Sequence, residues 1–340
     1  MSQKEATMSS ESKKDFKVKG ISLLSGGLDS ILAAKVVLLQ GIEVMGVTFE
    51  TPFFNARNAK IAAKQIGIPL SILNITGEHL EMLKAPRYGY GKNMNPCIDC
   101  HTLMLKKAGK VMEEAGADFV FTGEVLGQRP MSQNRQSLHM VAKNSGYGEY
   151  VLRPLSARRL PETKPELEGK IDREKLLDIS GRGRKQQLEL AKNYGITDYS
   201  SPAGGCLLTD PLFSRRLKEL FDQQRNFTIR DVELLKVGRH FRTDTHAKVI
   251  VGRNSFDNET IQHLSENTDM LLHMANHPGP MVLVTGGYDD KTLLLAASIC
   301  ALYSDAPNDR EVMVSVRTDN VEKSITIKAT SRQEIEPWMI

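Results

Sequence analysis

Three cysteines of this chain stand in polar, glycine- or proline-rich segments where their thiols could reach a reaction site. Cys97 and Cys100 form a Cys-x-x-Cys pair in a loop just before a predicted helix, and Cys206 follows a Gly-Gly pair far downstream. The fourth, Cys300, lies in the apolar run 293–303, where a small buried side chain is expected. Four cysteines in 340 residues do not make a disulfide scaffold, so the three are candidate ligands or catalytic groups.

Several kinds of site fit these thiols. Cys97-x-x-Cys100-His101 has the spacing of covalent haem attachment, but that chemistry needs export and the N-terminus shows no apolar export segment. A thioredoxin-like redox pair would need a thioredoxin-type sequence around the two cysteines, and this chain does not have one. A structural zinc ion would need four ligands, which Cys97, Cys100, Cys206 and His101 could supply. Three thiolates would instead leave one iron of a cubane iron–sulfur cluster open to an exogenous sulfide.

A second group of residues is suited to binding phosphate. Ser25-Gly26-Gly27-Leu28-Asp29-Ser30 follows a predicted strand and opens a predicted helix. The two glycines allow a tight turn that points backbone N–H groups outward, while the serines and the helix N-terminus add donors and a dipole. No lysine follows as in G-x-x-x-x-G-K-[ST], so this is not the nucleotide loop that holds β- and γ-phosphates.

The loop resembles the PP-loop of ATP pyrophosphatases, which cleave ATP between the α- and β-phosphates and adenylate their substrate. The resemblance implies a Rossmann-like, HUP-type parallel sheet, with ATP and Mg²⁺ as cofactors and Asp29 as a catalytic residue. It carries over as ATP-binding positions Ser25, Gly26, Gly27, Asp29 and Ser30. It also places the adenine beyond the second strand, near Val47, Thr48 and Phe49.

A third segment follows a later predicted strand, at the sheet edge where α/β proteins bind ligands. Thr122 to Gln133 resembles 4-thiouridine synthetases, which have Gly-Glu-x-Leu-Gly-Gln followed by Ser-Gln. The resemblance places around the nucleotide and the target base Gly123, Glu124, Gln128, Ser132 and Gln133. Asp99 and Glu124 are the acidic candidates for proton transfer or for Mg²⁺.

The cysteines resemble those of the iron–sulfur-dependent branch of tRNA thiolases, which combine a CxxC with a distant third cysteine. This implies a [4Fe-4S] cluster on Cys97, Cys100 and Cys206. Another branch, the tRNA 2-thiouridylases, passes a persulfide between two cysteines through a disulfide, and there Cys100 after Asn95-Pro96 and Cys206 would match. Cys97 favours the cluster because the persulfide route does not use it; Zn²⁺ remains a rival for the same ligands.

Two further segments could contact RNA. Arg182, Arg184 and Lys185 form a basic turn leading into a predicted helix, within a stretch, 153–192, that has eleven Lys/Arg and seven Asp/Glu. Downstream, residues 236–316 resemble the RNA-binding domain of NFACT proteins, with a Val-Gly-Arg-Asn turn, an Asp and His segment and a Pro-Gly turn. That resemblance maps RNA-binding positions onto Arg253, Asn254 and His273.

The elements that must position these residues fall into two domains. Short apolar strands alternate with helical stretches, which predicts a parallel α/β sheet. The expected strands are 21–24, 43–49, 70–75 and 118–122, and the expected helices are 31–40, 55–66, 102–115, 179–194 and 212–224. After residue 226 a smaller α+β domain is expected, with strands 248–251, 281–285, 312–317 and 324–328 and a helix 291–303. The boundaries drawn are a disordered tail 1–19, a PP-loop domain 20–225 and an RNA-binding domain 226–340.

The composition agrees with a globular protein, with 40% hydrophobic and 25% charged residues. The net charge of +4 does not by itself indicate a polyanion partner, and the longest apolar run is eleven residues against the ~20 of a spanning helix. We therefore expect a cytoplasmic protein without membrane contact.

Together these features predict an ATP-dependent tRNA thiouridine synthase fed through a [4Fe-4S] cluster. Its expected partners are tRNA and a sulfur donor, either sulfide or a cysteine desulfurase, and a homodimer is compatible with the sequence. The alternatives are a persulfide-type 2-thiouridylase using Cys100 and Cys206, a PP-loop ligase or amidotransferase with structural zinc, and a non-enzymatic RNA-binding module.

Overall fold

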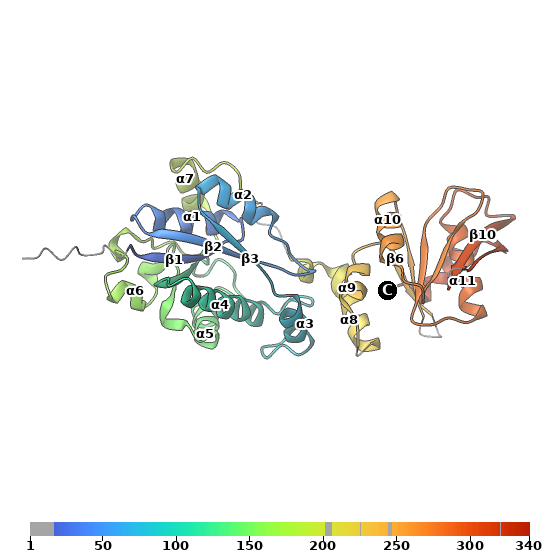
Figure 1. Cartoon of the computed structure of the whole chain (residues 1–340), viewed down its shortest axis with the longest axis horizontal. Helices are drawn as coiled ribbons and strands as arrows, with labels where there is room; N and C mark the ends of the chain where they lie inside the picture. The colour runs from blue at the N-terminus through green and yellow to red at the C-terminus, as the bar shows by residue number, and fades with distance from the viewer. Residues whose placement is uncertain (1–16, 201–205, 225, 244–246, 320) are drawn as a thin grey trace, which may run out of the picture. The chain divides into compact units, whose positions relative to one another are not determined.

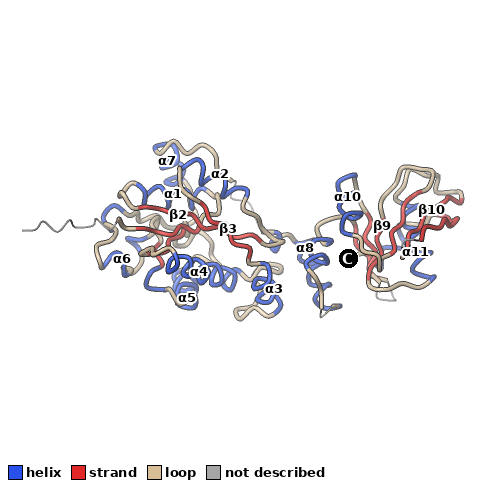
Figure 2. The backbone as a smooth tube through the Cα atoms, in the orientation of Figure 1, coloured by secondary structure: helices blue, strands red, loops and turns tan. Residues whose placement is uncertain are grey.

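The computed structural model describes residues 17–200, 206–224, 226–243, 247–319 and 321–340. The chain divides into two compact units, each with its own sheet (Figures 1 and 2). The first unit comprises residues 1–89 and 96–203, and the second comprises 90–95 and 204–340. Most of the predicted N-terminal tail, residues 1–16, lies outside the described residues.

The first unit is built on a parallel five-stranded sheet in the order β3-β2-β1-β4-β5. Its strands are β1 Lys19–Leu23, β2 Glu43–Glu50, β3 Leu70–Asn74, β4 Phe119–Thr122 and β5 Val151–Leu152. All four residues of β4 are buried, as expected of a strand covered on both faces. Strand order reverses between β1 and β4, so the carboxyl ends of these two strands flank the crevice where such sheets bind ligands.

Helices cover both faces of this sheet. They are α1 Leu28–Leu38, α2 Arg57–Ile66, α3 Thr76–Lys84, α4 Cys97–Glu114, α5 Arg135–Ser145, α6 Lys164–Leu167 and α7 Lys185–Asn193. Apolar side chains of α1, α2 and α7 share one core cluster, and those of α4 and α5 share another across the sheet (Figure 1). The N-termini of α1 and α4 therefore belong to opposite layers.

The second unit carries a six-stranded antiparallel sheet in the order β11-β10-β8-β9-β7-β6. The strands are β6 Arg239–Arg242, β7 Lys248–Val251, β8 Met270–Met274, β9 Val282–Thr285, β10 Glu311–Thr318 and β11 Val321–Lys328. The helices are α8 Pro211–Gln223, α9 Ile229–Leu234, α10 Ser255–Leu264, α11 Asp290–Leu302 and α12 Arg332–Ile335. Cys300 is buried in the core between α11 and the sheet, as predicted.

The predicted fold class, a parallel α/β sheet with a second domain, is confirmed. Three local predictions are wrong. The helix expected from 102 begins at Cys97, because Pro96 caps it and the Cys100 N–H donates to the Pro96 carbonyl at 2.9 Å. The helix expected from 179 begins at Lys185, because Ser180 pairs instead with Leu126. Helix α8, expected to close the first domain, packs in the second unit.

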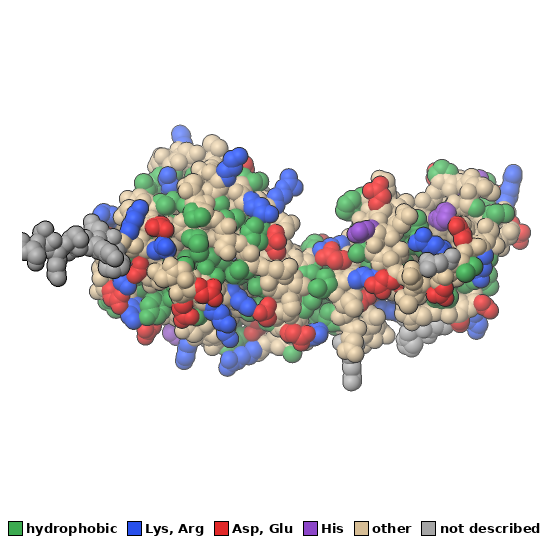
Figure 3. Space-filling model, in the orientation of Figure 1, with side chains coloured by type: hydrophobic (Ala, Val, Ile, Leu, Met, Phe, Trp, Pro, Cys, Tyr) green, Lys and Arg blue, Asp and Glu red, His purple; other side chains and the backbone are tan. Residues whose placement is uncertain are grey.

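No helix in the described ranges is long and apolar enough to cross a bilayer. On the face shown in Figure 3, acidic and basic side chains are interspersed rather than gathered in one large patch.

Candidate functional site

The loop between β1 and α1 is held in a fixed shape by its own hydroxyl groups. The Ser30 Oγ donates to the Gly27 carbonyl at 2.8 Å, and the Gly27 N–H donates to the Ser25 Oγ at 3.3 Å. Gly26 adopts a left-handed φ of 78°, and a Cβ there would lie 2.3 Å from the backbone of Asn58. Glycine is therefore required at position 26, both for the left-handed backbone and for the close approach of Asn58.

The segment after β4 presses against this loop. A Cβ on Gly123 would lie 2.4 Å from the Ser30 nitrogen, so only glycine allows β4 to end against the first turn of α1. The Gln128 amide donates to Asp29 Oδ2 at 3.0 Å. The structure thus brings the predicted positions of both segments together at the switch between β1 and β4.

Asp29 keeps one oxygen available in this crevice. Its Oδ1 is buried and has no hydrogen-bond partner among the residues that the structure describes. A buried carboxylate oxygen normally has a partner, so this atom marks a place for a ligand, either a cation or a hydroxyl group.

Ser200 was not found by sequence reasoning, although it holds the loop from its other side. Its N–H and its Oγ both donate to the Gly26 carbonyl at 3.2 Å, from 174 residues away in the sequence. Nothing local to Ser200 signals this contact. Ser200 also stands shortly before Cys206 in the sequence.

Glu124 lies deeper than the sequence suggested. Its carboxylate accepts from the Arg153 Nε at 3.0 Å and from the Thr122 hydroxyl at 3.1 Å, and it contacts His101 Nδ1 at 3.0 Å. Burial raises the pKa of Glu124, but the charge of Arg153 and the hydrogen bonds from His101 and Arg153 outweigh it and lower the pKa to about 2. Glu124 is thus a permanent carboxylate that orients His101 and pairs with Arg153.

Two other positions of this segment serve the loop itself. Ser132 and Gln133 are buried, and the Gln133 carbonyl accepts from the Gly127 N–H at 2.7 Å. They shape the turn that presents Gln128. The predicted adenine positions Val47 and Phe49 are buried in the core beside α4, and Thr48 is also buried.

Cys97 and Cys100 occupy the first turn of α4, on the same side of the helix. Cys100 is buried, and its Sγ lies 3.5 Å from His79 Nε2. The rings of Phe53 and Phe54 each lie 5.4 Å from the His79 ring. Burial lowers the pKa of His79 to about 4, so the imidazole beside the Cys100 thiol is neutral at pH 7.

Asp99, between the two cysteines in the sequence, contacts the loop before α4. Its carboxylate accepts from the Tyr88 N–H at 3.0 Å, in an exposed loop. This contact gives Asp99 a structural role in holding the loop before α4.

Cys206 belongs to the second unit, where its carbonyl accepts from the Thr209 hydroxyl at 2.7 Å. The segment 90–95, which ends just before Cys97, is fastened to the same turn. The Asn93 side chain donates to the Thr209 carbonyl at 2.8 Å, and the Met94 N–H donates to Ser214 Oγ at 3.4 Å. Within the described ranges, no three His, Cys, Asp or Glu side chains are grouped so that they could hold one metal ion.

The basic turn predicted to contact RNA lies beside the Gln128 loop. The Gly181 N–H donates to the Leu126 carbonyl at 2.7 Å, which places the turn next to the segment that follows Glu124. Arg182 and Lys185 are exposed and Arg184 is half-buried.

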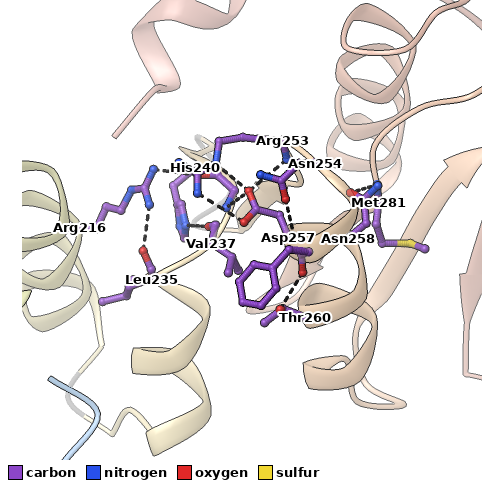
Figure 4. Close-up of polar contacts among 12 residues, drawn as sticks. Arg216, Leu235, Val237, His240, Arg253, Asn254, Asp257, Asn258, Thr260 and Met281 are labelled. Atoms are coloured by element: carbon purple, nitrogen blue, oxygen red, sulfur yellow. Dashed lines mark hydrogen bonds and ion pairs between the residues drawn. The ribbon is translucent and has the colours of Figure 1, made fainter. Parts of the chain in front are cut away.

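Two of the positions predicted to bind RNA, Arg253 and Asn254, have structural roles in the second unit (Figure 4). The Arg253 Nε donates to Asp257 at 2.6 Å, and Asn254 caps α10 by accepting from the Asp257 N–H at 2.9 Å. Burial raises the pKa of Asp257, but hydrogen bonds from Arg253 and from the Gly238 N–H outweigh it and lower the pKa. His273 lies half-buried on β8, opposite Ser315 of β10.

Comparison with known families agrees with both halves of this architecture. Residues 16–159 match the family model of the thiamine biosynthesis protein ThiI, and residues 238–339 match that of the NFACT protein RNA binding domain. The chain thus pairs a ThiI-like PP-loop domain with an NFACT-like RNA-binding domain. The loop Ser25–Ser30 lies in the part of the chain matched by the first family model, and Arg253 lies in the part matched by the second.

Individual curated relatives match part of this chain. A tRNA-specific 2-thiouridylase MnmA of Symbiobacterium thermophilum is 27% identical over 58% of this chain and 54% of its own length. A probable tRNA sulfurtransferase of Caldanaerobacter subterraneus subsp. tengcongensis is 32% identical over 40% of this chain and 36% of its own. The chain therefore spans about half, or less, of these curated relatives.

Among solved structures, a crystal structure of a 4-thiouridine synthetase–RNA complex with bound ATP covers 64% of this chain and 52% of its own. It is 23% identical to this chain, with a TM-score of 0.33.

Proposed function

We propose that this chain is an ATP-dependent tRNA sulfurtransferase, which replaces a uridine carbonyl oxygen with sulfur. The observation that carries the proposal is the meeting of the Ser25–Ser30 loop with Gly123 and Gln128 at the sheet's switch point. The matches to ThiI and to curated tRNA thiolation enzymes support the activity, and the RNA-binding match supports tRNA as the substrate.

The residues present fit ATP. The N–H groups and the dipole at the start of α1 suit the pyrophosphate end, where the developing negative charge of the leaving group needs stabilisation. The unpaired Asp29 Oδ1 suits Mg²⁺, which prefers carboxylate ligands near phosphates. Glu124 does not face the nucleotide in this proposal, because Arg153, Thr122 and His101 occupy its oxygens.

The chemistry follows from the leaving group. A uridine carbonyl oxygen leaves poorly by itself. Its attack on the α-phosphorus of ATP would release pyrophosphate and form an adenylated uridine, in which the oxygen can leave as part of AMP. A sulfur nucleophile then adds to the ring carbon and AMP departs.

For the sulfur we propose a [4Fe-4S] cluster on Cys97, Cys100 and Cys206. Two observations support it: iron–sulfur clusters are held by thiolates, and the thiols of Cys97 and Cys100 lie one helical turn apart. The described residues do not group a third ligand with this pair. When bound, such a cluster would supply an iron open to sulfide. Zn²⁺ is the rival on the same donors.

A persulfide route is the second candidate, and the contact between Cys100 and His79 favours it. The neutral imidazole 3.5 Å from the thiol can accept a hydrogen bond from it and so orient the sulfur for attack. In this route a cysteine persulfide would attack the adenylated carbon and expel AMP. The partner cysteine would then displace the thiouridine, forming a Cys100–Cys206 disulfide that an external thiol must reduce.

Docking of tRNA would involve both units. In the first, Arg182, Arg184 and Lys185 are suited to backbone phosphates next to the Gln128 loop. In the second, Arg253, Asn254 and His273 remain the proposed contacts. Phe256 adds an aromatic surface, because its side chain is 69% exposed three residues after Arg253 and could stack on an unpaired base.

The proposal is tested with thiouridine-free tRNA, ATP and sulfide under anaerobic conditions. Nucleoside mass spectrometry should detect thiouridine with the wild type and with Asp178→Ala, whose half-exposed carboxylate lies on the surface. Asp29→Ala should form neither AMP nor thiouridine. Thiouridine formation by Asp29→Ala at the wild-type rate would refute the active-site assignment.

Metal analysis of the same anaerobic protein distinguishes the sulfur routes. Iron and sulfide that are lost in Cys97→Ala support the cluster, and zinc alone supports a structural metal. The persulfide route needs a donor of sulfane sulfur in place of sulfide, such as a cysteine desulfurase with cysteine. With that donor, thiouridine formation that survives Cys97→Ala but not Cys206→Ala supports the persulfide route.

A further inference from the structure

Helix α8 contacts both the segments that border the cysteines and the RNA-binding sheet, and all these contacts lie within the second unit. Its first turns hold the segment 90–95 and the turn that follows Cys206. Asn93 reaches the Thr209 carbonyl, and Met94 reaches Ser214, whose hydroxyl also donates to the Leu208 carbonyl at 3.0 Å. Asn93 takes a left-handed φ of 60°, an unfavourable backbone that its side-chain hydrogen bond helps to hold.

The middle of α8 is fixed by a buried arginine to the segment that leads into the sheet. Arg216 is 5% exposed, and its two terminal nitrogens donate to the carbonyls of Leu235 and Gly238, both at 2.9 Å (Figure 4). Leu235 ends α9, where carbonyl groups favour a cation. Among the described residues no carboxylate forms an ion pair with Arg216, so these carbonyls are what holds its charge.

From Gly238 the contacts continue into the RNA-binding domain. The Gly238 N–H donates to Asp257 Oδ2 at 3.1 Å, and Asp257 is the ion-pair partner of Arg253 (Figure 4). Arg216 is thus linked to Arg253, a proposed RNA contact, through one residue, Gly238, and one carboxylate, that of Asp257.

A second attachment lies one turn further along α8. Glu219 pairs with Arg242 of β6 at 2.6 Å and with Lys248 of β7 at 3.1 Å. Lys248 is buried, so this ion pair is shielded from solvent. With 13 residues, α8 is about 20 Å long. Helix α8 is thus attached through Ser214 to the segment 90–95, through Arg216 to the segment that leads into β6, and through Glu219 to β6 and β7. These attachments make it a rigid connection.

We infer that α8 is a rigid connector that couples RNA docking to the placement of the segments beside the cysteines, residues 90–95 and 206–209. Arg216 is its positioning residue. The inference rests on the proposed function, since it concerns how bound tRNA and the sulfur-bearing cysteines are brought into register. Residues 90–95 and the Cys206 turn move with the RNA-binding sheet. The segment 90–95, which leads into Cys97, is therefore ordered by the domain proposed to bind the RNA.

Hydrogen exchange of the full chain tests the rigid connector without RNA. Arg216→Met keeps a long apolar side chain but removes both donors, and Arg215→Met changes an exposed neighbour on the same helix as a matched control. We expect amides in 90–95 to exchange about 10-fold faster in Arg216→Met, and unchanged in Arg215→Met and in the sheet core. Arg216→Lys, which keeps the charge and one donor, should be intermediate. If Arg216→Met does not fold, Arg216→Lys decides.

Unchanged exchange of 90–95 in Arg216→Met, or in Arg216→Lys if Arg216→Met does not fold, would overturn the inference.

Added tRNA gives a second readout, because it should slow exchange of 90–95 in the wild type and in Arg215→Met but not in Arg216→Met. Turnover gives a third: Arg216→Met should lower the maximal rate of thiouridine formation while the KM for tRNA stays within about 3-fold of the wild type. A raised KM with an unchanged maximal rate would contradict a positioning role. Exchange without RNA does not depend on thiolation, so failure of the proposed function would be recognised separately.

Discussion

Replacement of Glu124 by glutamine should destabilise the first unit strongly, because it removes the only carboxylate that pairs with buried Arg153 in the described residues. Breaking a buried ion pair on one side costs about 3–5 kcal/mol. The pKa of Glu124 gives an independent figure. A fall from 4.5 to about 2 corresponds to about 3 kcal/mol of stability at neutral pH.

The sign of the pH dependence follows from the direction of the shift. Because the pKa is lower in the folded protein, the contribution of Glu124 is fully present above pH 4.5 and is lost as the pH falls towards 2. The difference in the free energy of unfolding between the wild type and Glu124→Gln should therefore shrink progressively as the pH falls from 4.5 towards 2. Above it, the difference in the free energy of unfolding should be constant.

Urea unfolding followed at several pH values measures this difference. Glu162→Gln is the matched control, since its half-exposed carboxylate contacts Arg173 at the surface and should contribute less than about 1 kcal/mol. If Glu124→Gln and Glu162→Gln unfolded alike at pH 7, Glu124 would not be the buried anchor that the structure shows.

Three further changes test other parts of the molecule. Gly123→Ala should reduce AMP formation at least 10-fold, because its Cβ would displace the first turn of α1, whereas Gly77→Ala, with open space around it, should leave the rate unchanged. Glu219→Gln should lower the free energy of unfolding of the second unit by about 3 kcal/mol, measured in urea, because it leaves Lys248 buried without its carboxylate. Phe256→Ala should weaken RNA binding at least 5-fold by fluorescence anisotropy, whereas Leu294→Ala, another exposed apolar side chain, should not.

The parts of the site that could be predicted are those encoded by local spacing. The loop from Ser25 to Ser30 folds on its own hydroxyl groups, and Gly123 meets it because β1 and β4 are neighbours in a parallel sheet. Both relations follow from the order of the elements. The strand and helix alternation is equally local, so most bounds were predicted to within a few residues.

The parts that could not be predicted depend on contacts between distant segments. Ser200 reaches Gly26, Arg153 pairs with Glu124, and Asn93 reaches Thr209, each across a separation that no sequence pattern marks. The start of α4 at Cys97 is different, because proline at a helix start is a recognised signal and Pro96 stands directly before the pair.

The most direct test of the central claim is the ratio of AMP to thiouridine formed by the wild type on thiouridine-free tRNA with ATP and sulfide. Adenylation of the carbonyl oxygen requires one AMP for each thiouridine, so the account predicts a ratio of about one in a single turnover. Thiouridine formed without AMP, or AMP formed on tRNA without any thiouridine, would contradict it.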